Sequence, residues 1–231
     1  MSEHLLDLGQ ATLRAVDAVE WLTSSAPVVY PDAVALMEEK VLAIARGEAP
    51  ECVWLLEHPP LYTAGTSADP AELIAPHRFP VFKTGRGGRF TYHGPGQRAA
   101  YVMLDLSGRD RDVRAFVQAL ENWMITALDA LGVSGERHDN QIGAFVGDAK
   151  IASIGVRVRH WVTMHGVSLN VAPDLEHFSG ILPCGLSCPV TSLAALGAET
   201  DMTLVDLALR ATFVEAFGRG IVSANDPSRA R

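Results

Sequence analysis

Cys184 has the residue type and the neighbours of a nucleophile. It lies in residues 182–189 (LPCGLSCP), between a proline and a glycine, which favour a loop. A buried cysteine is by default a small apolar core residue, whereas loops are where nucleophiles tend to be presented. As a thiolate, Cys184 could attack a carbonyl group and carry an acyl group. The residue types leave both interpretations open.

A lysine and a glycine-rich stretch could serve such a nucleophile. Lys150 lies in residues 147–155 (GDAKIASIG), at the base of a predicted hairpin. A lysine there is usually solvated, but in a half-buried pocket it could pair with an anion and act as acid or base. Residues 85–97 (GRGGRFTYHGPGQ) are rich in glycines, which either let the backbone approach a ligand closely or flank a simple hairpin. The stretch matches neither a P-loop nor GxGxxG.

Metal chemistry is not indicated. Cys184 and Cys188 have a Cys-x-x-x-Cys spacing, but the sequence has no second cysteine pair and no HExxH motif, and a zinc site needs about four ligands. The histidines show no convincing ligand spacing, and spacing does not identify a histidine partner for Cys184. We therefore predict no metal and no cofactor.

Composition predicts one globular domain over residues 1–231, because 48% of the residues are apolar, 20% are charged, and no repeat or linker is present. The polar tail, residues 223–231, is expected to be disordered. The odd number of cysteines favours a reducing compartment. The first residues do not resemble a secretory signal, and no apolar run approaches the roughly 18 residues that span a membrane. We expect a cytoplasmic protein without a membrane partner.

The formal charge of −8 argues against a general nucleic-acid binder, which needs a basic field. Basic residues nevertheless cluster locally. Either these clusters are solvated strand faces and loops, or they form an anion-binding patch on an acidic protein. The two clusters are Lys83, Arg86 and Arg89, and Arg157, Arg159 and His160.

Hydrophobic periodicity predicts an α+β fold with a mixed sheet and packed helices, because helices and antiparallel strands are segregated in the sequence. Asp32 is expected to cap the first helix. The predicted helices are residues 33–46, 112–131 and 204–217; the predicted strands are residues 52–57, 80–83, 101–106, 142–146, 150–158 and 162–171.

Five segments, in this order, resemble the octanoyl-[acyl carrier protein]:protein N-octanoyltransferases, the lipoyl (octanoyl) transferases of lipoate biosynthesis. They are residues 57–63 (EHPPLYT), 86–97 (RGGRFTYHGPGQ), 147–155 (GDAKIASIG), 165–171 (HGVSLNV) and 183–185 (PCG). The resemblance covers roughly residues 57–193. It implies the fold of the lipoate ligase and biotin ligase catalytic domains, with a mixed, largely antiparallel sheet and packed helices.

The resemblance also implies roles for individual residues. It makes Cys184 the nucleophile that forms an acyl thioester and Lys150 the lysine that lowers the pKa of that thiol. Cys188 receives no role. The residues implied to contact substrate are Arg86, Gly87, Gly88, Arg89, Phe90, Thr91, Tyr92, His93, Ser153, Ile154, Gly155, Gly166, Val167 and Ser168.

The implied reaction moves an octanoyl group from octanoyl-acyl carrier protein to a lysine of a lipoyl domain. The acceptors would be lipoyl domains of 2-oxoacid dehydrogenases and the glycine cleavage H protein. Thiol-to-thiol exchange is nearly isoenergetic, so a cysteine can hold the acyl group and keep it activated. Acyl carrier proteins and lipoyl domains are acidic as families, so the two basic clusters are candidate docking sites.

Three other functions remain open. An ATP-dependent lipoate-protein ligase of the same fold would need an adenylate site but no catalytic cysteine. A lipoyl-domain octanoyl amidotransferase would also use a cysteine but would differ in its donor. A carrier-binding module would hold acyl proteins without turnover.

Overall fold

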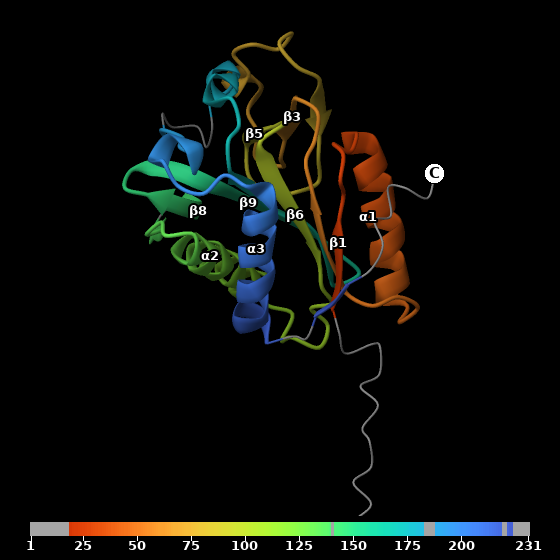
Figure 1. The fold of residues 1–231 in the computed structure, drawn as a ribbon. Helices are drawn as coiled ribbons and strands as arrows, with labels where there is room; N and C mark the ends of the chain where they lie inside the picture. Colours follow the sequence, from red (N-terminus) through yellow and green to blue (C-terminus); the bar gives the residue numbers. More distant parts are fainter. Residues whose placement is uncertain (1–18, 140, 183–187, 219–220, 224–231) are drawn as a thin grey trace, which may run out of the picture.

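The computed structural model describes residues 19–139, 141–182, 188–218 and 221–223. Within these residues, two β-sheets and three α-helices form the architecture (Figure 1). Across the same ranges, no helix is both long enough and apolar enough to cross a membrane.

The larger sheet has the strand order β11-β1-β2-β6-β10-β9-β8-β7 in the described part of the chain. Strand β1 pairs in parallel with β2 and with β11, and the other neighbouring strands pair antiparallel. This mixed, largely antiparallel sheet with packed helices confirms the predicted α+β class. The bounds are β1 (Val19–Thr23), β2 (Cys52–Leu56), β6 (Gln97–Met103), β7 (Glu136–His138), β8 (Gln141–Val146), β9 (Ala149–Arg159), β10 (Val162–Asn170) and β11 (Ile221–Ser223).

A smaller sheet has the order β4-β3-β5 and comprises β3 (Leu61–Ala64), β4 (Val81–Lys83) and β5 (Phe90–His93). The glycine-rich stretch supplies β5 to this sheet, turns at residues 94–96, and continues as β6 in the larger sheet. The simple hairpin considered from composition is therefore wrong, because β5 and β6 belong to different sheets. The turn places the stretch at the junction between the two sheets.

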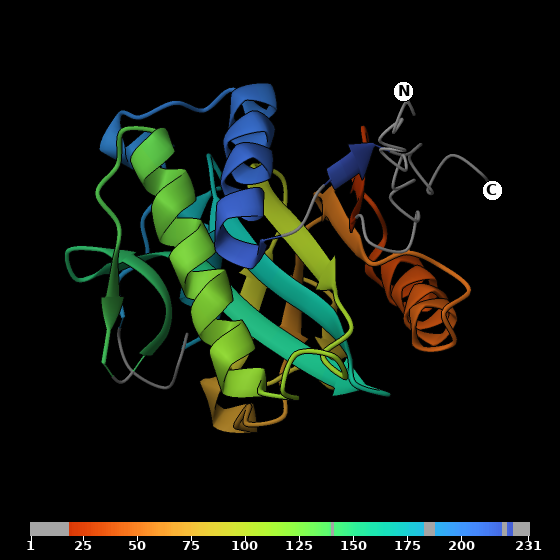
Figure 2. The same ribbon diagram turned by 90° about the horizontal axis from the view of Figure 1, so that it is seen from below.

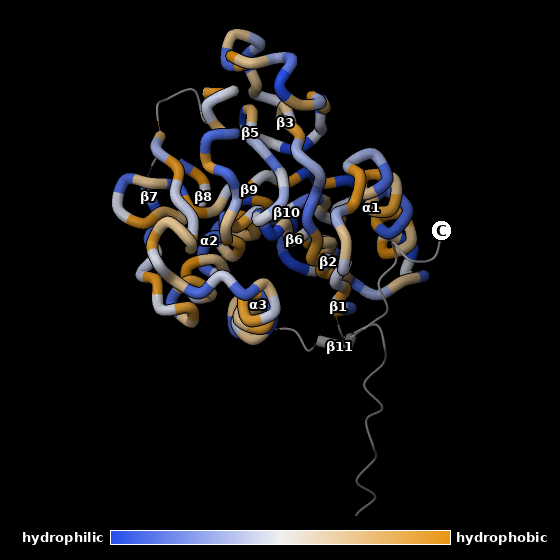
Figure 3. Tube along the Cα trace, turned by 45° about the horizontal axis from the view of Figure 1, so that its top comes forward, coloured by the Kyte–Doolittle hydropathy of each residue, from blue (hydrophilic) through white to orange (hydrophobic). Residues whose placement is uncertain are grey.

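Three helices cover the larger sheet. Helix α1 (Tyr30–Ala45) packs on one face, while α2 (Val113–Ala130) and α3 (Met202–Phe217) pack together on the other (Figures 1 and 2). Apolar and polar stretches alternate along the helices in Figure 3, as expected for helices with one buried face. The predicted cap was wrong: Asp32 lies inside the first turn of α1, where its carboxylate faces the positive end of the helix dipole.

An aromatic cluster fixes α2 and α3 against β1. The Trp123 ring lies 5.3 Å from the Phe213 ring and 6.4 Å from the Trp21 ring, centroid to centroid. The Trp123 Nε1–H also donates to the Leu209 carbonyl oxygen at 2.8 Å, so the buried indole has its polar partner. This packing holds the middle of α2 against α3 and β1.

In the described part of the chain, the sequence patterns did not predict the short strands β1, β3, β5, β7 and β11, nor three 3₁₀ turns. These turns are η2 (Pro70–Glu72), η3 (Leu175–Gly180) and η5 (Ala194–Leu196). Ser223 belongs to β11, so the predicted disordered tail begins too early. Residues 224–231 lie outside the described residues.

Candidate active site

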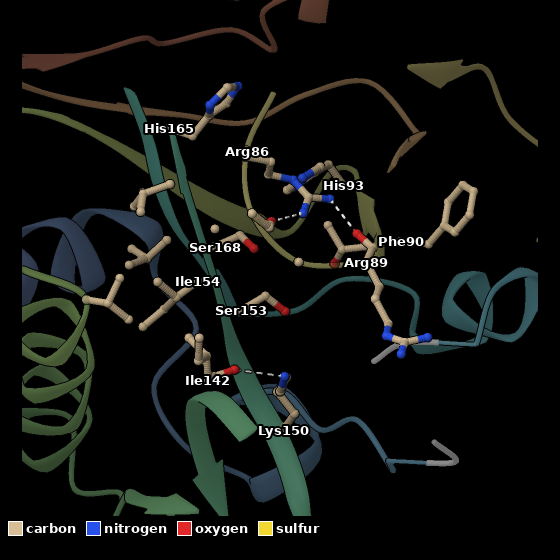
Figure 4. A pocket seen from close by; sticks show the side chains of 18 of the residues that line it. Arg86, Arg89, Phe90, His93, Ile142, Lys150, Ser153, Ile154, His165 and Ser168 are labelled. Atoms are coloured by element: carbon tan, nitrogen blue, oxygen red, sulfur yellow. Dashed lines mark hydrogen bonds between the residues drawn. The ribbon is translucent and has the colours of Figure 1, made fainter. Parts of the chain in front are cut away.

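A pocket of about 670 Å³ lies along β9 and β10 (Figure 4). The glycine-rich stretch forms one wall, and the N-terminal half of α2 contributes Val113 and Val117. Strand β8 pairs with β9 only through residues 149–152 in the described part of the chain. The remainder of β9 therefore presents an open edge, and lining residues come from both faces of the sheet at that edge.

The pocket gathers nearly all of the residues that the family resemblance implied. Those that line it are Arg86, Gly87, Gly88, Arg89, Phe90, Thr91, His93, Lys150, Ser153, Ile154, Gly155, Gly166, Val167 and Ser168. Tyr92 does not line it. Tyr92 is buried beside Phe178 and Tyr62, and its hydroxyl pairs with His177 Nδ1 at 2.8 Å. Cys184 lies outside the described residues.

Lys150 is buried in the pocket wall. Its side chain donates from Nζ to the Ile142 carbonyl oxygen at 3.0 Å, and Nζ lies 5.1 Å from the centre of the Phe145 ring. The residue is only 5% exposed. The solvated lysine expected at a hairpin base is therefore wrong, and Lys150 holds its ammonium group in the partly apolar wall of the pocket.

The backbone of Lys150 anchors one end of the segment that contains Cys184. The Lys150 N–H donates to the Pro189 carbonyl at 2.8 Å, and the Thr191 N–H donates to the Lys150 carbonyl at 2.9 Å. At the other end of the segment, the Leu182 N–H donates to the Glu72 carbonyl at 2.8 Å. Both described flanks of residues 183–187 are thus held by backbone hydrogen bonds.

Arg86 organises the glycine-rich wall. Its buried guanidinium donates from Nη2 to the Thr63 carbonyl at 2.9 Å and to the Arg89 carbonyl at 3.0 Å. Hydrogen bonds from a charged donor are stronger than neutral ones, so they fix the loop firmly. A Cβ atom at Gly155 would lie 2.9 Å from Arg86 Cδ and 3.2 Å from the Gly87 carbonyl oxygen. The loop can therefore approach β9 this closely because residue 155 is glycine.

Buried tyrosines and histidines form the wall opposite Lys150. The Tyr30 hydroxyl lies 3.2 Å from His165 Nε2, and the Tyr101 hydroxyl lies 2.6 Å from His58 Nε2. Burial lowers the pKa of His58 to about 4, and burial with nearby Arg86 lowers the pKa of His165 to about 3. Burial raises the pKa of Tyr30 to about 12. These groups are consequently neutral at pH 7.

A buried relay sets the tautomer of His93. The Thr191 carbonyl can only accept a hydrogen bond, so Asn170 Nδ2 donates to it at 2.9 Å. The Asn170 Oδ1 atom then accepts from Gln97 Nε2 at 2.9 Å, and Gln97 Oε1 lies 2.7 Å from His93 Nδ1. His93 must therefore carry its proton on Nδ1. Burial holds the pKa of His93 well below its ordinary value.

The charges of the described lining residues favour an anion. They include the cations Lys150, Arg86 and Arg89 but no aspartate or glutamate. Arg89 forms an ion pair with Glu72, which lies behind the wall. A thiolate placed beside Lys150 would be stabilised by the nearby positive charge.

An apolar slot occupies the α2 side of the pocket. Val113 and Val117 are four residues apart, so they share one face of the helix. They face Ile154, Val156 and Val167 from the sheet, all of which line the same pocket. A buried methylene contributes about 0.8 kcal/mol, so such a slot can hold an acyl chain.

Several lining residues were not identified from the sequence. His165 begins the segment HGVSLNV, so the motif could have indicated it. Tyr30 and Tyr101 carry no local signal, and the valines of α2 belong to an ordinary amphipathic pattern. Only the packing of distant elements brings them to one cavity.

The fold is shared with a putative lipoate protein ligase and with a biotin protein ligase. A putative lipoate protein ligase, Ta0514 from T. acidophilum with bound lipoic acid, superposes with a TM-score of 0.68 at 15% identity, covering 90% of this chain and 88% of that one. Biotin protein ligase from Aquifex aeolicus superposes with a TM-score of 0.50 at 11% identity, covering 87% of this chain and 68% of that one. The family model of the lipoyl protein ligase A/B catalytic domain matches residues 30–214.

A protein named octanoyltransferase from Parvibaculum lavamentivorans is 58% identical over 224 residues, which cover 93% of this chain and 98% of the relative. The chain therefore belongs to the lipoyl protein ligase A/B catalytic-domain family and, within it, to the octanoyltransferases, which are acyltransferases.

Proposed function

We propose that the protein transfers an octanoyl group from octanoyl-acyl carrier protein to a lysine of lipoyl domains, through an acyl thioester on Cys184 and without a cofactor. The acceptors are lipoyl domains of 2-oxoacid dehydrogenases and the glycine cleavage H protein. The observation that carries the proposal is the buried ammonium of Lys150, whose backbone anchors the segment that follows Cys184. A reduced thiol is required, which suits the cytoplasm.

In the first half-reaction, the Cys184 thiolate attacks the thioester carbonyl carbon of the donor. A carbon–sulfur bond to Cys184 forms, and the bond to the carrier thiol breaks. Lys150 gives its proton to the leaving carrier thiolate and becomes a neutral amine. An ordinary cysteine with a pKa of about 8.5 is only a few per cent ionised near neutrality, so a neighbouring cation increases the reactive fraction.

In the second half-reaction, the neutral amine of the acceptor lysine attacks the acyl-enzyme. The amide bond forms, and the bond to Cys184 breaks. Lys150 accepts the proton of the amine, while Cys184 leaves as a thiolate, so both groups return to their initial states. The cationic lining repels an ammonium group, and the acceptor must therefore enter as the free amine.

The apolar slot between α2 and the sheet is the proposed site of the octanoyl chain. It is lined by buried and half-buried aliphatic side chains, whereas the wall opposite it is polar. Burial of six or seven methylenes at about 0.8 kcal/mol each would hold the chain firmly. The backbone of the glycine-rich wall leaves room for the arm that carries the thioester.

Intact mass spectrometry after mixing with octanoyl-carrier protein tests the intermediate. The wild-type chain should gain about 126 Da, the mass of an octanoyl group that replaces hydrogen, and Cys184→Ser should gain no stable thioester adduct. A lipoyl domain added without ATP should then receive the octanoyl group. Dependence on ATP would indicate a ligase, and an octanoyl-lipoyl domain that serves as the better donor would indicate an amidotransferase.

A further inference from the structure

The two basic clusters of the sequence meet in space beside the open edge of β9. A Cβ atom at Gly85 would lie 2.8 Å from Arg157 Cδ and Nε, so the glycine-rich backbone passes directly beside that side chain. The Gly87 N–H also donates to the Val156 carbonyl at 2.9 Å. Lys83 is exposed two residues before Gly85. Lys83, Arg157 and Arg159 therefore form one surface, the β9 basic cluster.

This cluster keeps a positive charge on an acidic chain. The side chains of Arg157 and Arg159 are 37% and 41% exposed, and their Nη1 atoms lie 3.8 and 3.3 Å from the same Glu38 Oε1 atom. One carboxylate cannot balance two guanidinium groups, and Lys83 adds a further positive charge. The formal charge of the whole chain is −8, so the cluster is a local exception.

The β9 basic cluster lies at the opposite end of β9 from Lys150. Arg157 lies seven positions after Lys150 in β9, which corresponds to roughly 20 Å at the usual rise of a strand. Ser153, Gly155 and Val156 line the pocket between these positions. The pocket therefore runs from the lysine toward the basic surface.

We propose that the β9 basic cluster docks the acidic carrier protein that brings the octanoyl group, and not the acceptor domain. This inference rests on the proposed function. A carrier protein presents its thioester at the end of a long flexible arm, which can follow the pocket from Arg157 to Lys150. An acceptor lysine has only a four-carbon stem, so its domain must dock close to the reacting thiol. Charge complementarity with an acidic carrier raises its association rate.

The test compares two donors that differ only in docking. Octanoyl-carrier protein needs the surface, whereas octanoyl-pantetheine supplies the same thioester without a protein. Acyl-enzyme formation is measured for Arg157→Glu/Arg159→Glu and for the milder Arg157→Gln/Arg159→Gln. The control, Arg46→Glu/Arg137→Glu, makes the same change in net charge at two exposed positions, the C-cap of α1 and strand β7. Thermal melting reports the folding of every variant.

At about 0.01 M salt, the charge-reversed variant should raise KM for octanoyl-carrier protein at least tenfold. Its acylation by octanoyl-pantetheine should stay within twofold of wild type, and the glutamine variant should show a smaller effect in the same direction. The difference in KM for octanoyl-carrier protein between the charge-reversed variant and wild type should shrink toward 1 M salt, where the Debye length falls to about 3 Å. The control variant should match wild type with both donors.

Three outcomes would overturn the proposal: no change with the carrier donor at low salt, an equal loss with both donors, or a selective loss of transfer to the lipoyl domain. The last outcome would assign the cluster to the acceptor. Failure of the proposed function is distinguishable, because wild type would then form no acyl-enzyme from either donor.

Discussion

Lys150 Nζ and the Ile142 carbonyl oxygen are 3.0 Å apart across the β8–β9 hairpin. The bond positions the ammonium by the backbone of a neighbouring strand, and a backbone acceptor cannot be displaced by a change of rotamer. The same lysine is bonded through its own backbone to the segment that follows Cys184. Lys150 thus places a positive charge in the pocket through its side chain, and through its backbone it holds the residues that follow Cys184.

Substitution of Lys150 should separate the two half-reactions. Lys150→Met should slow acyl-enzyme formation at pH 7 by about tenfold and move its pH profile upward, because the thiolate loses its cation. Lys150→Arg keeps the charge but cannot accept a proton, so amide formation should fall more than acylation. Rapid-quench measurement of each step checks this. Acylation by Lys150→Met with wild-type rate and pH profile would exclude the role in ionising the thiol.

Acyl-chain length should depend on Val117. Val117→Phe fills the apolar slot, and we expect the ratio of kcat/KM for octanoyl over butanoyl donors to fall at least tenfold, since a wall discriminates more strongly than one methylene. Gln118→Phe introduces the same ring at the next, exposed position of α2 and should leave that ratio unchanged. If Val117→Phe and Gln118→Phe changed the ratio of kcat/KM for octanoyl over butanoyl donors by the same factor, the proposed slot would be wrong.

Gly155→Ala should disturb the glycine-rich wall. The added methyl would lie 2.9 Å from Arg86 Cδ and 3.2 Å from the Gly87 carbonyl oxygen. We expect a loss of about 1–3 kcal/mol in the free energy of unfolding, typical of overpacking, together with a higher KM for the donor. Gly108→Ala is the matched control, because no atom lies within 4 Å of a Cβ there. Urea denaturation and donor kinetics measure both effects.

Buried neutral histidines should make the fold sensitive to acid. His58 has a folded-state pKa of about 4, below the unfolded value near 6.5, so the unfolded chain binds the extra proton. The contribution of neutral His58 to the free energy of unfolding is fully present above pH 6.5. It is lost as the pH falls toward 4, at on the order of 1.4 kcal/mol per pH unit. Urea denaturation between pH 7 and pH 5 measures the free energy of unfolding at each pH. This free energy should fall less steeply with decreasing pH for His58→Gln than for wild type. His77→Gln, at an exposed position, should retain the wild-type slope.

The elements predicted best from the sequence are those whose pattern is long. Helix α2 was expected at residues 112–131 and spans Val113–Ala130, because its apolar stripe persists over several turns. Strand β1 was missed because five residues give too short a pattern. Its burial depends on Trp21 meeting Trp123 and Phe213, which are distant in sequence.

At the site too, residues in contiguous motifs were predicted, whereas contacts between residues distant in sequence were not. The family resemblance supplied the residues of the glycine-rich wall and Lys150, because these lie in contiguous motifs. Residue spacing could not indicate that Gly87 would pair with Val156, or that Tyr30 would face His165. Those contacts depend on the junction of the two sheets, which no local pattern encodes.

The contact between the glycine-rich stretch and β9 also affects the tendency of the chain to aggregate. An open strand edge presents unpaired backbone groups that can recruit a strand from another molecule and begin aggregation. Here the Gly87 N–H occupies the Val156 carbonyl, and exposed arginines follow immediately at residues 157 and 159. The geometry that opens β9 to substrates therefore also protects it against pairing with a second chain.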